Sequence, residues 1–239
     1  MGKNSMLVSD RVSAILKTNK KGDKQFGLRD AYKKNIKALG EIAAKRWLSE
    51  HIEMTLKFRD LLAREDWAIG DTEATGLGAS AEICEIAFQP NGEGKAGWEQ
   101  LVKPVRQEIS SGSESVHGIS NSMVQNSPTL KDLAPKINRA LKRLSNVVFY
   151  NWEYDRRVVE QSCYANGIPN LEWPEAIDVL PWFSAWGGEW NAKQLGWKYM
   201  KLEGSHRALG DCQELLEQMT RAATSDVDYA KALLSGEEK

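Results

Sequence analysis

An acidic triplet at the end of an apolar segment is the first feature of the chain that is suited to chemistry. Asp71 and Glu73 close the segment that starts at Trp67. Side chains two apart on a strand share a face, and two carboxylates so close are unfavourable without a cation between them. Hard oxygen ligands favour Mg²⁺ or Mn²⁺ over zinc. Most such triplets are solvated surface charges, so the metal prediction needs support from the rest of the chain.

Two further carboxylates have a similar setting. Asp155 comes shortly after the apolar segment 146–150, and Asp211 follows His206 by five residues. Five helical residues rotate about 140° beyond one full turn, so His206 and Asp211 cannot share a helix face. We therefore expect His206 on a loop or in a first turn, with Gly204 giving mobility. The alternative is that both aspartates cap or solvate helices and that His206 packs without a function.

Short apolar segments separated by turns predict the elements that position these side chains. The first three expected strands form an antiparallel meander with a turn at Asn91-Gly92, and later strands alternate with helices. This order predicts an α/β fold with one mixed sheet flanked by helices. The expected strands are 67–70, 82–88, 98–102, 146–150 and 176–180, and the expected helices between them are 129–144 and 155–166.

Residues 1–64 differ from the remainder in charge, and we expect them to form a basic helical extension. They hold 15 Lys and Arg against 7 Asp and Glu, giving +8, so residues 65–239 carry −9 of the total of −1. Apolar residues recur at helical spacing from Leu28 to Arg64, which predicts one long helix or a helical pair with a bend at Gly40 or near His51. His51 is expected on the helix surface. The extension is interpreted either as a cap on the following domain, as a dimerisation or partner-binding element, or as a contact for a polyanion.

Composition bounds the class of protein. A chain of 239 residues with 41% apolar and 27% charged residues is typical of a globular protein with one sizeable core and a small appendage. Three scattered cysteines do not form a disulfide framework or a zinc knuckle. Neither a signal core nor a membrane-spanning run is present, so we expect a cytoplasmic protein without membrane contact.

In this order and spacing the motifs resemble those of the DnaQ-like 3′–5′ exonucleases of the DEDDh type. The resemblance covers residues 67–219 and implies an RNase H-like fold for the exonuclease domain, residues 65–239. A segment between the first two motifs, 116–120, is also similar. The matching positions are Asp71, Thr72, Glu73, Thr75, Gly76, Leu77, Asn151, Asp155, His206 and Asp211.

The resemblance implies a role for each motif residue. Asp71, Glu73 and Asp211 would bind one of two Mg²⁺ or Mn²⁺ ions, Asp71 would bridge to the second, and Asp155 would support it. His206 would act as the general base, because its ordinary pKa near 6.5 leaves the imidazole largely neutral at cellular pH.

The remaining site residues are expected to contact substrate. Thr75, Gly76 and Leu77 would bind the terminal nucleotide. The alternative is that these residues only form the loop and have no contact with substrate. His117 is expected to have a structural or a substrate-contact role, and Asn151 would orient its loop or touch substrate. The tryptophans at 173, 182, 186, 190 and 197 are expected mostly in the core, with base stacking by one of them as the alternative.

The resulting prediction is a two-metal 3′–5′ exonuclease that releases nucleoside 5′-monophosphates from nucleic-acid 3′ ends. Single-stranded or frayed DNA is the favoured substrate, and RNA stays open because recognition of a 2′-hydroxyl depends on pocket geometry. The alternative is a catalytically silent member of the same fold that holds nucleic acid or a protein partner. A homodimer or a protein partner through the N-terminal helices is a further expectation.

Overall fold

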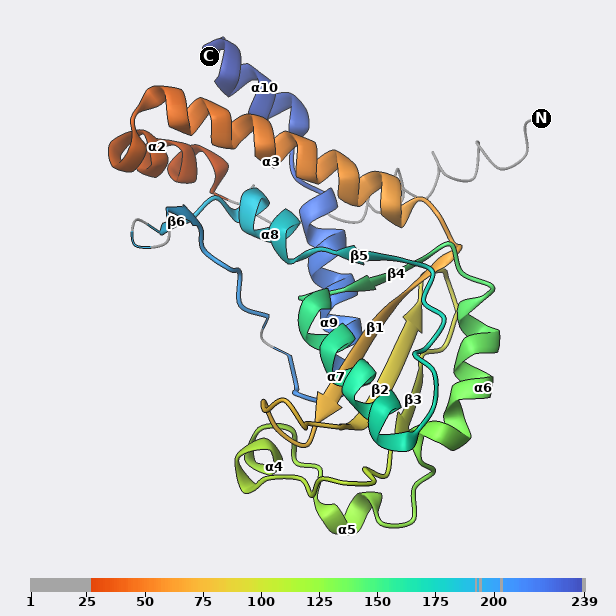
Figure 1. Cartoon of the computed structure of the whole chain (residues 1–239). Helices are drawn as coiled ribbons and strands as arrows, with labels where there is room; N and C mark the ends of the chain where they lie inside the picture. The colour runs from red at the N-terminus through yellow and green to blue at the C-terminus, as the bar shows by residue number, and fades with distance from the viewer. Residues whose placement is uncertain (1–26, 192, 194, 203, 238–239) are drawn as a thin grey trace, which may run out of the picture. The chain divides into compact units, whose positions relative to one another are not determined.

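The computed structural model describes residues 27–191, 193, 195–202 and 204–237. Residues 1–26 of the predicted basic extension lie outside the described residues. The chain divides into two compact units, and Figure 1 labels their elements. The described residues of the first unit fall within the ranges 1–64, 180–201 and 217–239, and those of the second within 65–179 and 202–216.

The second unit is built on a five-stranded mixed sheet with the strand order β3-β2-β1-β4-β5. The pairs β1/β2 and β2/β3 are antiparallel, whereas β1/β4 and β4/β5 are parallel. The predicted meander and the predicted mixed sheet are therefore confirmed. The strands are β1 (Trp67–Ala74), β2 (Ile83–Pro90), β3 (Trp98–Leu101), β4 (Asn146–Phe149) and β5 (Glu175–Asp178).

Helices cover both faces of this sheet (Figure 1). The amphipathic helices α6 (Leu130–Leu141) and α7 (Trp152–Asn166) pack on one face, where their apolar residues join those of the strands in one core cluster. The first half of α9 (Ala208–Ala223) lies on the other face, where the Cys212 thiol donates to the Ile69 carbonyl oxygen at 3.7 Å. The short helices α4 (Ser111–His117) and α5 (Asn121–Val124) belong to the connection from β3 to α6.

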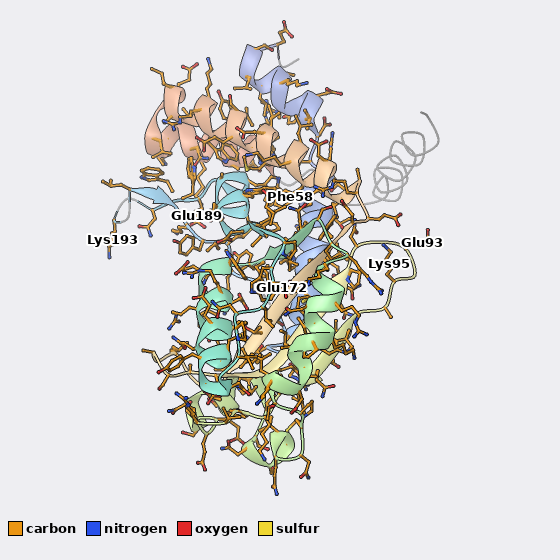
Figure 2. The ribbon with its side chains drawn as sticks, turned by 45° about the vertical axis from the view of Figure 1, so that its right-hand side comes forward. Phe58, Glu93, Lys95, Glu172, Glu189 and Lys193 are labelled. Carbon is orange, nitrogen blue, oxygen red and sulfur yellow. The ribbon has the colours of Figure 1, made fainter. Side chains whose placement is uncertain are left out.

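The sheet starts and turns through short loops. Figure 2 labels Glu93 and Lys95 in the turn between β2 and β3, and the Lys95 ammonium donates to the Glu65 carbonyl oxygen at 3.0 Å. This contact ties the hairpin turn to the residues that enter β1. The central strand is therefore held at its start as well as along its length.

The first unit is helical. Gly40, with φ 86°, separates α2 (Leu28–Leu39) from α3 (Glu41–Leu62), which confirms a helical pair. Since few residues other than glycine adopt a positive φ easily, Gly40 sets the break. The other elements of the unit are α8 (Leu180–Gly187), β6 (Trp190–Asn191), β7 (Gly196–Trp197), the end of α9 and α10 (Val227–Ser235).

Helix α3 is the core of this unit. Phe58, labelled in Figure 2, packs against Phe183 of α8 with ring centroids 4.7 Å apart. His51 was expected on the helix surface, and that expectation is wrong. It is buried, its ring stacks on Trp186, and its Nδ1 donates to the Trp186 carbonyl oxygen at 2.7 Å. Spacing along α3 could not reveal that α8 covers this face.

None of the described helices combines the length and the apolar character that a membrane span requires. The predicted division at residue 64 stays a prediction, since the first compact unit also takes in residues 180–201 and 217–239.

Candidate active site

Strand β1 presents two acidic side chains on one face. Asp71 and Glu73 are half-buried, while Thr72 and Ala74 between and beyond them are buried on the opposite face. Asp211, in the first turn of α9, reaches the same place. Ligand oxygens of Asp71, Glu73 and Asp211 all lie within 4.8 Å of one another. Segments that are about 140 residues apart in the chain thus bring three carboxylates to one point.

Asp155 lies beside this group rather than within it. It is buried in the first turn of α7, and its Oδ1 accepts a hydrogen bond from the Thr72 hydroxyl at 2.7 Å. Its charge is nevertheless the largest of the neighbouring charges that raise the pKa of Asp71. Asp155 is therefore close enough to act electrostatically on the acidic group.

The acidic cluster is short of positive charge. Burial raises the pKa of Asp71 well above its ordinary value, and the charges of Asp155, Glu73 and Asp211 raise it further. Burial and the neighbouring carboxylates raise the pKa of Glu73 to about 8. Burial also raises the pKa of Asp155, to about 7, against the lowering effect of its hydrogen bond with Thr72. A divalent cation would relieve this repulsion, and carboxylate oxygens are the donors that Mg²⁺ and Mn²⁺ prefer.

His206 is attached to the cluster through its backbone. It lies in the loop before α9, as the five-residue spacing predicts, with an exposed side chain and a φ of 53°. Its N–H donates to Asp211 Oδ1 at 3.0 Å. Gly204 was expected to give mobility, but the structure shows a steric reason for it. A Cβ at residue 204 would lie 2.3 Å from Asp211 Oδ1, so only glycine allows this loop to pass the carboxylate.

Glu85 is a residue of the site that sequence reasoning missed. It stands opposite Glu73 in the β1/β2 register and is almost fully buried. Its carboxylate accepts hydrogen bonds from Arg207 Nε at 3.0 Å and from the Ala208 N–H at 2.9 Å. Glu85 thereby holds the residue after His206 and the first residue of α9. The only signal in the sequence is an acidic residue inside an otherwise apolar strand.

Thr75, Gly76 and Leu77 leave the end of β1. The Thr75 N–H donates to the Glu82 carbonyl oxygen at 2.8 Å, and its side-chain oxygen accepts from the Glu82 N–H at 3.0 Å. Thr75 therefore closes the loop. Leu77 follows in the same loop and is 80% exposed.

His117 and Asn151 lie in loop-fixing positions. His117 is buried, its Nδ1 accepts from the Ile119 N–H at 3.0 Å, and its Nε2 donates to the Ala74 carbonyl oxygen at 3.2 Å. Both ring nitrogens are thus used within the protein, which corresponds to the structural alternative. Asn151 has a φ of 75°, and its N–H donates to Asp178 Oδ1 at 3.2 Å.

The geometry can be compared with known proteins. The RNase T exonuclease family model matches residues 69–219. An uncharacterized exonuclease of Escherichia phage 186, CP81, is 31% identical over an alignment of length 163, and the match covers 61% of this chain and 82% of that protein.

Two solved structures are similar to this chain, and the first of them shares its fold. Exonuclease I of E. coli, in complex with a dA16 oligonucleotide, has a TM-score of 0.56 at 15% identity, over 72% of this chain and 43% of that one. This chain thus spans less than half the length of exonuclease I. Exonuclease X, in complex with 5′ overhanging duplex DNA, has a TM-score of 0.47 at 24% identity, over 69% and 99% of the two chains. The family match, the phage relative and the RNase H-like sheet agree with the DnaQ-like resemblance. The chain belongs to the RNase T exonuclease family.

Proposed function

We propose that the chain is a 3′–5′ exonuclease that hydrolyses the terminal phosphodiester bond of nucleic acid and releases nucleoside 5′-monophosphates. The observation that carries this proposal is the meeting of Asp71, Glu73 and Asp211 within 4.8 Å, with His206 bound to Asp211 through its backbone. Membership in the exonuclease family supports the class of reaction, and the carboxylate cluster supports a metal-dependent hydrolysis. The proposal favours single-stranded or frayed DNA, which agrees with the fold likeness to exonuclease I bound to an oligonucleotide.

The residues of the site fit a pair of divalent cations. The donors are carboxylates only. Burial, and after it the repulsion between neighbouring carboxylates, raises the pKa values of Asp71 and Glu73, and a bound cation would offset both effects. Asp71, Glu73 and Asp211 would hold one Mg²⁺ or Mn²⁺ ion, and Asp71 with Asp155 would hold the second. When bound, such ions make a water molecule more acidic and stabilise negative charge on a leaving oxygen.

The protein positions the groups that move the proton. The exposed imidazole of His206 takes the proton of the attacking water, since a neutral imidazole can accept one near neutral pH. The hydrogen bond from the backbone N–H of His206 to Asp211 supports this role, because it holds residue 206 next to one carboxylate of the cluster. Glu85, through Arg207 and Ala208, holds the same loop from the side of the sheet.

The loop after β1 is proposed to receive the last nucleotide. Because the Thr75 N–H is already used by Glu82, contacts to the 3′-hydroxyl fall to the backbone of Gly76 and Leu77. The exposed Leu77 side chain offers an apolar surface for the terminal base. Asn151 and His117 support this region by fixing the adjacent loops.

End-labelled single strands test the proposal. With Mg²⁺, a 3′-labelled strand should release labelled mononucleotide at once, whereas a 5′-labelled strand should shorten in single steps. A strand with a blocked 3′ end should stay intact, and Asp71→Asn should show no turnover. Release of label from the 5′ end first would refute the polarity. Binding without shortening, equal in wild type and Asp71→Asn, would instead support a catalytically silent binding protein.

The role of the N-terminal helices stays a prediction. A homodimer or a protein partner through residues 1–64 is tested by measuring the molar mass of the full chain in solution.

A further inference from the structure

Helix α7 carries a partly exposed stripe that the proposed chemistry does not use. Arg157 follows Tyr154 by three residues and Tyr164 follows it by ten, a spacing that places all three on one side of the helix. Loop residues Leu77 and Arg106 adjoin this side, since Arg157 donates to the Leu77 carbonyl oxygen at 3.3 Å. We call these five residues the α7 stripe.

The α7 stripe alternates aromatic rings with guanidinium groups. The Arg157 guanidinium lies 5.4 Å from the centre of the Tyr154 ring, and the Arg106 guanidinium lies 5.0 Å from that of Tyr164. Tyr164 is 76% exposed. By contrast, every tryptophan among the described residues is at least partly buried, including those weighed as stacking platforms. Among the described residues of the second unit, the exposed aromatic surface is therefore that of Tyr164 on α7.

The charges of the stripe differ from those of its surroundings. Arg156, next to Arg157 in the chain, forms salt bridges to Glu153 and Glu160 at 2.8 and 2.9 Å. Among the described residues, no carboxylate forms a salt bridge with Arg157 or Arg106. Residues 65–239 carry −9, so a polyanion approaching this part of the chain needs local cations. Arg157 and Arg106 supply them.

One end of the stripe lies at the acidic cluster. Tyr154 directly precedes Asp155, whose Oδ1 accepts a hydrogen bond at 2.7 Å from the hydroxyl of Thr72, the residue between Asp71 and Glu73. The other end, Tyr164, is ten residues further along α7, which is about 15 Å at the rise of a helix. A stacked strand advances about 3.4 Å per nucleotide, so this length suits up to about four nucleotides.

We propose that the α7 stripe binds the single-stranded segment that leads to the 3′ end held in the active site. This inference rests on the proposed function and adds the path of the substrate strand. Bases stack on Tyr164, and phosphates contact Arg157 and Arg106, a combination that binds single strands with little sequence preference. Leu77, whose carbonyl oxygen accepts from Arg157, adjoins this path and would contact the terminal nucleotide.

The test compares adjacent arginines on one helix in the full-length protein. Arg157→Ala and Tyr164→Ala should each raise the KM for a single strand of about 16 nucleotides roughly tenfold, with kcat little changed. Arg157→Ala should also flatten the dependence of log affinity on log salt by about 0.7. Arg156→Ala, which removes a guanidinium already paired with carboxylates, should leave the KM and the salt dependence unchanged.

A small substrate separates the stripe from the active site. Thymidine 5′-(p-nitrophenyl phosphate) is too short to reach Tyr164, so its kcat/KM should be the same in wild type, Arg157→Ala and Tyr164→Ala. Wild-type KM values for the long strand in both variants would overturn the inference, as would an equal loss on the small substrate. Anisotropy of the labelled strand in EDTA reports binding without turnover. If the wild type showed no turnover, the proposed function would be refuted. If Tyr164→Ala but not Arg156→Ala then still weakened binding of the strand, the inference that the α7 stripe binds single strands would hold.

Discussion

Replacing Glu73 by glutamine should stabilise the metal-free protein while removing most of its activity. Burial of the Glu73 carboxyl group, together with the negative charges of Asp211, Glu85 and Asp155, raises its pKa from 4.5 to about 8. Taken in full, a change of this size corresponds to about 4–5 kcal/mol, at 1.36 kcal/mol for each tenfold change in acidity. Glu73 is only half-buried, so solvent screening leaves about 2 kcal/mol.

The sign of the pH dependence follows from proton binding. Between pH 4.5 and 8 the folded carboxyl group holds its proton, whereas the unfolded one has lost it. The folded state then binds more protons, so the free energy of unfolding falls as the pH rises through this window. Glu73→Gln lacks this contribution, so its advantage over wild type should be absent below pH 4.5, grow up to about pH 8 and then stay constant.

Thermal unfolding in EDTA measures the effect. For a chain of this length 2 kcal/mol corresponds to roughly 4–8 °C in Tm, which is the expected advantage of Glu73→Gln at pH 8. The exposed Glu108→Gln serves as the matched control and should unfold as wild type. Added Mg²⁺ should raise the Tm of wild type at pH 8 much more than that of Glu73→Gln. Equal Tm values of wild type and Glu73→Gln in EDTA at pH 8 would refute the charge-repulsion argument.

Three further predictions concern the base, its support and the basic extension. His206→Ala should retain Mg²⁺ and strand binding but lose about 10²–10⁴ in kcat, and full turnover would contradict its role as base. Arg207→Ala should lower kcat because Glu85 then holds the loop only through the Ala208 N–H. In a His206→Ala background the same change should have little further effect, whereas additive losses would mean that Arg207 acts independently of His206. Deleting residues 1–26, which carry 6 Lys and Arg against 2 Asp, should reduce the salt dependence of strand binding, and an unchanged dependence in a filter-binding titration would leave that segment without a role in it.

Local periodicity was sufficient for several features of the site. Asp71 and Glu73 share a face because side chains alternate along a strand, whatever surrounds the strand. His206 lies outside α9 because five residues do not return to the same side of a helix. The antiparallel meander followed from the order of apolar segments and turns. Each of these features depends on residues close together in the sequence.

Other features were decided by segments that meet only in the folded protein. Glu85 has the appearance of an ordinary strand residue, and its burial opposite Glu73 is possible because Arg207, 122 residues later, arrives to pair with it. His51 is buried because α8 covers its side of α3. The sequence by itself determined which side chains share a face, since that depends on backbone geometry alone. Only the tertiary structure decided which charges are buried and which are paired, because the cost of burying a charge depends on partners brought from distant parts of the chain.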